Sequence, residues 1–134
     1  MADLIPVAAD VLKYDGAQID TGIAGAAIVA GQVIYRDSTG VLQLADDTTA
    51  IKAAALGIAL NGGAVGQPIT YAKAGGIDLG CAVVVGVVYG VTDTAGGISD
   101  IVDRASGDYV TILGIGVTAS RINLAINKSA VAIA

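Results

Sequence analysis

Every acidic residue of this chain is an aspartate: the 134 residues include twelve Asp and no Glu. Glu supports helices, whereas Asp favours turns and helix caps. The nineteen glycines act in the same direction, because glycine weakens helices and serves in turns and bulges. Together these residues predict an all-β fold, a compact sandwich or barrel-like domain of short strands and tight turns.

The core of such a domain has to be built from small side chains. Hydrophobic residues make up 54% of the chain, yet there is no Trp and no Phe, and the aromatic residues are five tyrosines. Ala, Val, Ile and Leu each bury little area, and burial contributes ~25 cal/mol per Å². We therefore expect a modestly stable monomer that gains stability from neighbouring subunits.

The charge excludes two classes of partner. The chain carries a net charge of −5, with seven dispersed Lys and Arg residues. Nucleic acids and anionic membranes both need clustered cations, so neither is expected as a partner.

The single cysteine, Cys81, excludes an intrachain disulfide, and the run Gly80–Val85 predicts a buried strand with Cys81 in the core. Asp3 lies where a secretory signal peptide would carry positive charge, so we expect no such signal.

No catalytic or metal site is predicted. The chain has no His, which removes the usual general base and metal ligand, and one Cys cannot form a zinc cluster. Asp46 with Asp47, and Asp100 with Asp103 and Asp108, are interpreted as solvated turn acids, because calcium loops have denser acids and a defining glycine. We therefore predict a protein that is not an enzyme and needs no cofactor.

The first 22 residues predict an extended N-terminal arm in front of a β domain over residues 23–134. The segment is apolar but interrupted by Pro6, which suits an edge strand or an extended segment. An arm of this kind can add to the sheet of a neighbour; the alternative is an ordinary first strand of the domain. The candidate interface residues of the arm are Leu4, Ile5, Pro6, Val7, Val11, Leu12 and Tyr14.

The β domain shows one hairpin, one helical turn and three further strands. Gln32–Tyr35 and Val41–Leu44 flank a tight turn and predict the hairpin. Asp and Thr residues before Ala50–Ala55 predict one short capped helix. The further strands are Leu56–Leu60, Gln67–Ala72 and Arg121–Asn127, the last with Ile122, Leu124 and Ile126 facing inward.

Two segments recur at an offset of about 56 residues. Asp37–Val41 parallels Asp93–Ile98, and Leu56–Leu60 parallels Leu113–Val117. The offset suggests an internal duplication over about residues 28–72 and 84–128. The alternative is coincidence in a background of few residue types.

At this point the chain resembles a known family. The run Ala30–Leu42 (AGQVIYRDSTGVL), followed by Leu56–Leu60 (LGIAL) and Gly66–Thr70 (GQPIT), is similar to the capsid cement, or head decoration, proteins of tailed bacteriophages. Ala105–Thr111 and the strands after it, LGIG and LAIN, resemble phage structural proteins of the same type. The resemblance covers roughly residues 28–128.

The resemblance implies a noncatalytic virion protein on the outer surface of a phage capsid, assembled in the bacterial host cytoplasm. Such proteins form homotrimers and clamp neighbouring subunits of the major capsid protein, which stabilises the head. The chain's partners would then be the major capsid protein and further copies of itself. From the residues alone, a carbohydrate-binding or tail-associated adhesion module stays open as the alternative, with the tyrosines as stacking surfaces.

Overall fold

The structure is a computed structural model that describes residue 4 and residues 6–14, 16–101 and 107–132. The described part is almost entirely β, as the composition predicts. One 3₁₀ turn, η1, spans Ala8–Asp10. The strands are β1 Leu12–Lys13, β2 Gln18–Ile23, β3 Val33–Arg36, β4 Leu42–Leu44, β5 Gly57–Ala59, β6 Pro68–Asp78, β7 Val88–Val91, β8 Ile98–Asp100, β9 Tyr109–Gly116 and β10 Arg121–Ala132.

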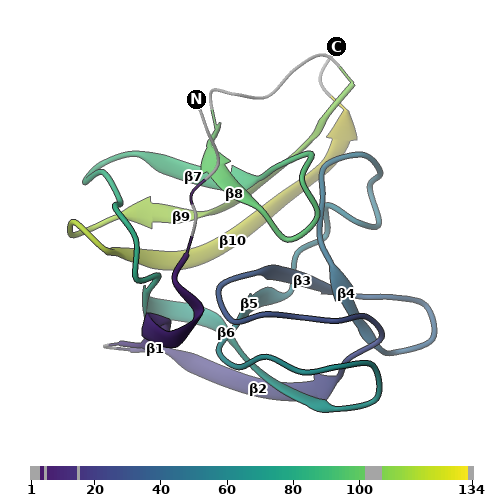
Figure 1. The fold of residues 1–134 in the computed structure, drawn as a ribbon. Helices are drawn as coiled ribbons and strands as arrows, with labels where there is room; N and C mark the ends of the chain where they lie inside the picture. The colour runs from purple at the N-terminus through teal and green to yellow at the C-terminus, as the bar shows by residue number, and fades with distance from the viewer. Residues whose placement is uncertain (1–3, 5, 15, 102–106, 133–134) are drawn as a thin grey trace.

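The long strand β6 joins two antiparallel sheets (Figure 1). Its first half pairs with β5 and β2, in the sheet that continues to β3 and β4. Its second half pairs with β10 and β1, in the sheet that continues to β9, β7 and β8. The chain therefore forms two layers, with β7–β10 above β2–β6 in the view of Figure 1.

A glycine marks the point where β6 passes from one sheet to the other. Gly75 has a φ of 87°, a left-handed conformation that side chains other than glycine rarely adopt. It is also the first residue of β6 that pairs with β10, opposite Leu124. Any side chain at this position would overlap the backbone of Gly16 and Ala17. Gly75 thus combines a kink in the strand with a close approach of the N-terminal segment.

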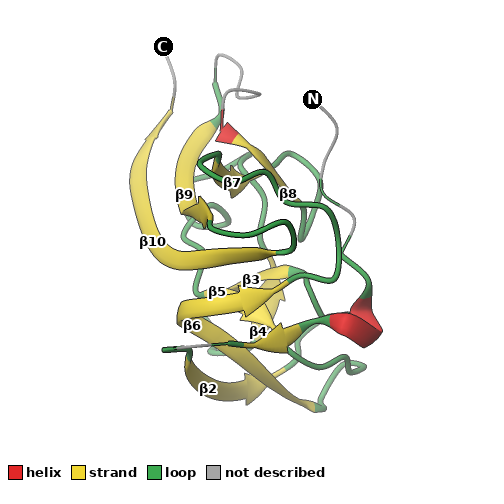
Figure 2. Cartoon of the chain, turned by 90° about the vertical axis from the view of Figure 1, so that its left-hand side faces the viewer, coloured by secondary structure: helices red, strands yellow, loops and turns green. Residues whose placement is uncertain are grey.

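The first sheet curls into a half-barrel (Figure 2). The chain leaves β2 at Ala24, which forms an isolated parallel bridge with Leu42 in β4. Gly22, the second-to-last residue of β2, lies against the Leu42 side chain, which occupies the space that a side chain at position 22 would need. The sequence prediction of a barrel-like β domain agrees with this curvature.

Two hydrophobic clusters follow from this arrangement. The smaller cluster fills the inside of the curled sheet and includes Ile34, Leu42, Ile69 and Tyr71. The larger one lies between the two sheets and contains residues of both. Because β3 and β5 lie between the two clusters, they are buried on both faces, and their sequences VIY and GIA are continuously apolar instead of alternating.

The same arrangement of four strands occurs twice. The hairpin β3–β4 lies next to β5, which lies next to β6, and the hairpin β7–β8 lies next to β9, which lies next to β10. The predicted hairpin is confirmed, with Tyr35 opposite Gln43 and a turn closed by the Gly40 N–H and the Asp37 carbonyl at 3.0 Å. The two similar sequence segments thus occupy matching places: the turns 37–40 and 93–97 close the hairpins, and LGIAL and LGIGV contain β5 and the end of β9.

The Asp37 side chain fixes the first of these turns. Its carboxylate accepts hydrogen bonds from the backbone N–H of Thr39 at 2.9 Å and from the Gln43 amide at 3.0 Å. The Thr39 hydroxyl donates to the same carboxylate. These hydrogen bonds lower the pKa of Asp37 below its ordinary value, with the Thr39 hydroxyl as the largest cause. The aspartate-rich composition is therefore used here as the sequence predicts, in a turn.

Two local predictions need correction. The predicted helix over Ala50–Ala55 is a single turn. The Thr49 carbonyl accepts an i+4 hydrogen bond from the Ala53 N–H, and the Thr49 hydroxyl accepts an i+3 hydrogen bond from the Lys52 N–H. Within the described residues, the 3₁₀ turn η1 lies in the N-terminal segment, and Ile101, directly after β8, is also in a 3₁₀ conformation. The predicted strand over Gly80–Val85 is a loop, because Gly80 has a φ of 66° and ends the extended backbone of β6.

Candidate interaction surface

The N-terminal segment lies along its own chain in this structure. The Leu4 N–H donates to the Ile98 carbonyl at 2.7 Å, and the Val7 N–H donates to the Leu79 carbonyl at 3.2 Å. β1 then pairs with β6, with Leu12 opposite Asp78. The segment therefore contacts the β8 strand, the chain after β6 and β6 itself.

The predicted arm residues separate into two groups by exposure. Val11 is buried in the larger core, and Leu4 and Pro6 are partly buried. Val7, Leu12 and Tyr14 are exposed, and Ile5 lies outside the described residues. In the single chain this segment contributes to the domain's own sheet and core. Addition of the segment to a neighbour's sheet remains a prediction.

One charged residue fastens the end of the segment to the second sheet. The Arg121 guanidinium lies over the Tyr14 ring, 3.2 Å from its centroid. Its Nε lies 3.7 Å from Oδ2 of Asp78. The Asp78 carboxylate also accepts hydrogen bonds from the Gly80 N–H at 2.8 Å and the Ser120 hydroxyl at 3.2 Å. Arg121 thereby connects β10, the end of β6 and the residue that follows β1.

We expect Arg121→Met to lower the free energy of unfolding by about 1–2 kcal/mol. The substitution keeps an unbranched stem but removes a cation–π contact and a partly buried ion pair, which together have this magnitude. Urea unfolding followed by circular dichroism measures the change. Lys13→Met is the control, because Lys13 is an exposed cation on the neighbouring strand β1. Equal losses for the two variants would contradict the fastening role of Arg121.

Exposed apolar side chains occur on this segment and on two segments near it. They lie in the N-terminal segment (Val7, Leu12), in the loop between β6 and β7 (Val84, Val85) and in the turn between β9 and β10 (Val117), and we call these five residues the apolar end. The loop is attached to the turn by hydrogen bonds from the Val83 N–H to the Ala119 carbonyl and from the Gly86 N–H to the Gly116 carbonyl, both 2.8 Å. Figure 1 shows this loop and this turn on the left, above β1.

The sequence did not predict the exposed loop of the apolar end. Val84 and Val85 are 60% and 64% exposed, although the sequence predicts a buried strand that ends at Val85. The signal was the pair of glycines that flank them, Gly80 and Gly86, both with positive φ. Cys81, in the same loop, is partly buried and packs against the larger core.

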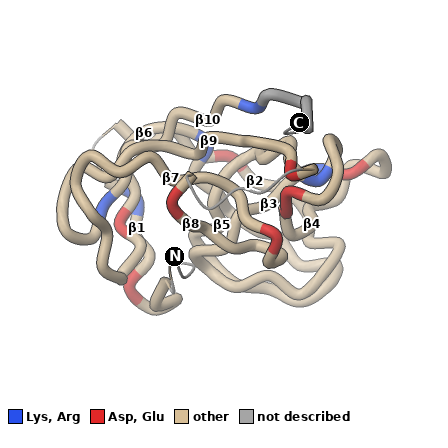
Figure 3. The backbone as a smooth tube through the Cα atoms, turned by 90° about the horizontal axis from the view of Figure 1, so that it is seen from above, with Lys and Arg blue, Asp and Glu red and all other residues tan. Residues whose placement is uncertain are grey.

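The described residues hold no group of three acids or cysteines close enough together to bind a metal ion. Asp46 accepts hydrogen bonds from the N–H and hydroxyl of Thr48, as a turn acid does. Asp47 is buried, so its interpretation as a solvated acid is wrong. Asp103 lies outside the described residues. A cavity of about 380 Å³ lies beneath the N-terminal segment, and its described lining, which includes Leu4, Pro6 and Gln32, has no titratable side chain. Charged residues are scattered along the chain with long uncharged stretches between them (Figure 3).

Comparison with known proteins identifies no family. No protein-family model matches the sequence. No curated protein matches it either. Within the part of the chain that the structure describes, no helix is both long and apolar enough to cross a membrane.

Proposed function

We propose that this chain is a capsid cement protein. In this function it binds the outside of a tailed-phage head as a homotrimer and clamps neighbouring subunits of the major capsid protein. The observation that carries the proposal is the apolar end, where five exposed hydrophobic residues lie on three adjoining segments of a chain with net charge −5. Exposed apolar clusters of this kind mark protein–protein contacts.

The physical demands of a clamp agree with this surface. A cement protein has to hold many identical positions at once, so each contact can be weak while the symmetric array binds strongly. Apolar contact without charge also keeps its strength when the salt concentration changes. The rest of the surface, acidic and sparsely charged, keeps the free chain soluble.

The alternative, a carbohydrate-binding or adhesion module, finds less support. Sugar binding by stacking needs exposed aromatic faces. Tyr35, Tyr71 and Tyr89 are buried, and the hydroxyl groups of Tyr71 and Tyr89 accept hydrogen bonds from Arg36 and from the Val84 N–H. Tyr14 is exposed, but Arg121 lies over its ring.

Charge introduced at the apolar end tests the proposal. We expect the double variant Val84→Asp/Val85→Asp to bind heads assembled without this chain at least tenfold more weakly than the natural protein. Burying two carboxylates in an apolar contact carries a penalty far above that of a tenfold change. Cosedimentation of the purified chain with such heads measures the affinity.

The matched control carries the same substitutions at equally exposed apolar residues elsewhere. Ile51→Asp/Val65→Asp changes two side chains that are each 69% exposed and lie outside the apolar end. It should bind heads as the natural chain does. Light scattering should give a mass of three times 13.1 kDa for the free protein. A monomer whose binding is equally weakened by both double variants would overturn the proposal.

A further inference from the structure

A cleft opens where β6 leaves β10. The two strands pair from Arg121 opposite Asp78 to Leu124 opposite Gly75, and the kink at Gly75 then carries β6 into the other sheet. Beyond Leu124, the described ladder partners of β10 all belong to β9. From Ala125 onward, the edge of β10 that faced β6 therefore has no strand beside it among the described residues.

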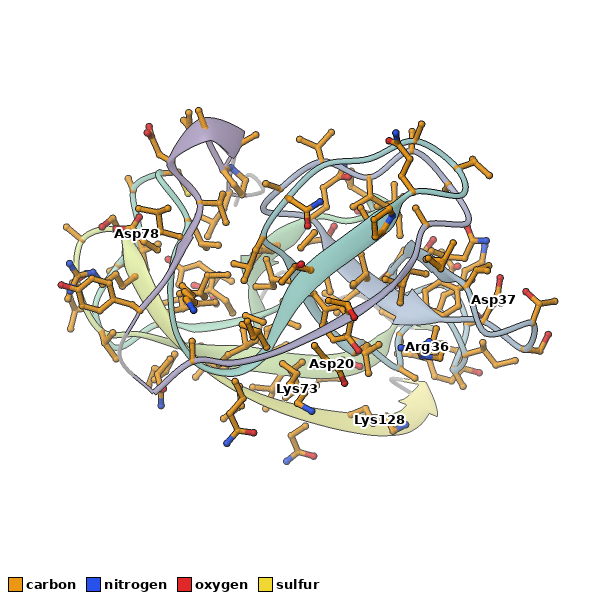
Figure 4. All side chains as sticks on the ribbon, turned by 90° about the horizontal axis from the view of Figure 1, so that it is seen from below. Asp20, Arg36, Asp37, Lys73, Asp78 and Lys128 are labelled. Carbon is orange, nitrogen blue, oxygen red and sulfur yellow. The ribbon has the colours of Figure 1, made fainter. Side chains whose placement is uncertain are left out.

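Most residues that line this cleft are uncharged, and the charged ones are basic. It has a volume of about 580 Å³, and its lining residues are Ala55, Leu56, Lys73, Ala74, Ala125, Ile126, Asn127 and Lys128. Both charged residues in this lining are lysines, in a chain whose net charge is −5. Figure 4 shows Lys73 and Lys128 on the same side of the molecule, with Asp20 beside Lys73.

We propose that this cleft binds an extended, acidic segment of a partner protein, which adds as a strand to the open edge of β10. An unpaired strand edge is a template for an added strand, because its backbone groups supply the hydrogen bonds. The lysines select the charge of that strand, since complementary charge determines which partner is accepted.

The residues of the cleft define what such a segment looks like. The stretch Ala125–Lys128 offers four positions for pairing, about 13 Å of extended chain. Ile126 and Leu56 pack against the two hydrophobic clusters and offer apolar contacts inside the cleft. A strand that contains both small apolar residues and aspartates offers apolar side chains to Ile126 and Leu56 and carboxylates to Lys73 and Lys128.

Asp20 already occupies one of the lysines in the free chain. Its Oδ2 lies 3.6 Å from Nζ of Lys73, with both side chains about half exposed. The pKa of Asp20 is lowered, first by the hydrogen bond from the Thr21 N–H and then by the charge of Lys73. An exposed pair of this kind is weak and exchanges readily, so an incoming carboxylate competes with Asp20 for Lys73.

The inference does not rest on the capsid function, and a peptide tests it directly. The probe is a fluorescein-labelled hexapeptide of alternating Asp and Val, followed by fluorescence anisotropy with the full chain. Lys73→Glu and Lys128→Glu should each weaken binding at least tenfold. Asp20→Asn, which releases Lys73, should strengthen binding several-fold. Lys13→Glu, on an exposed lysine outside the cleft, should leave it unchanged.

Amide hydrogen exchange separates strand addition from general attraction between charges. In the presence of the peptide, exchange should slow at Ala125–Lys128. An alternating Lys–Val hexapeptide should cause neither binding nor slowing. Equal binding of the two peptides, equal losses for Lys13→Glu and Lys128→Glu, or unchanged exchange at Ala125–Lys128 would each overturn the inference.

Discussion

Alanine at Gly57 or Gly114 should destabilise the domain by about 3 kcal/mol or more, enough to unfold much of a marginally stable chain. A methyl group at Gly57 would overlap the carbonyl oxygen of Ala72 in β6, and one at Gly114 would overlap that of Asn123 in β10. Both obstacles are backbone atoms inside a ladder, so a side-chain rotation cannot relieve the overlap. The strands would have to separate, which breaks hydrogen bonds of the ladder.

Thermal and urea unfolding of the two variants measure this loss, with Gly66→Ala as the control. Gly66 has a φ of 88° and open space around the position of its missing Cβ. Its substitution should cost about 1 kcal/mol, the price of a left-handed alanine alone. If Gly57→Ala and Gly114→Ala cost no more than Gly66→Ala, close approach of the strands is not what these glycines provide.

At Gly57 and Gly114 the sequence predicts the strand but not the reason for the glycine. The motifs Leu56-Gly57-Ile58 and Leu113-Gly114-Ile115 are visible as similar segments, and both occur in strands as predicted. Both positions require glycine for the same reason: the backbone of the neighbouring strand leaves no room for a Cβ atom. The tertiary fold determines which strand lies there. A single sequence shows that glycine is present but does not show what approaches it.

The inward positions of β10 could be predicted because one rule decides them. Ile122 and Leu124 are buried and Ile126 is partly buried, as strict alternation requires. The loop around Val84 could not be predicted in this way, because a run of valines has no alternation to indicate an exposed face. Its conformation depends instead on Gly80 and Gly86, and on hydrogen bonds to the turn between β9 and β10.

The basic cleft lies beyond sequence reasoning for another reason. Lys73 and Lys128 are 55 positions apart and come from strands of different sheets. They meet at one cleft because β6 kinks at Gly75, where its pairing with β10 begins. The two lysines lie close together because of that kink. The sequence AGG around Gly75 does not indicate which strands pair on either side of it.

Removal of residues 1–16 should unfold the domain, or come close to it, instead of trimming a dispensable arm. Burial of the Val11 side chain contributes about 1.5–3 kcal/mol. The truncation also removes the Leu4 and Pro6 packing, the β1 pairing with β6 and the contact of Tyr14 with Arg121. We expect a total loss above about 4 kcal/mol, a large part of the stability of a domain of this size.

Circular dichroism and urea unfolding of the truncated chain distinguish the two interpretations of this segment. An arm that serves only neighbouring subunits would leave the unfolding midpoint unchanged while capsid binding disappears. A segment that belongs to the domain's own sheet and core lowers the midpoint before any capsid is added. Leu12→Lys completes the test, because Leu12 is 61% exposed, its substitution leaves the core intact, and a cation at this position lies opposite Asp78. We expect this variant to fold normally and to bind heads at least tenfold more weakly, which separates the contact made by the segment from its part in the fold.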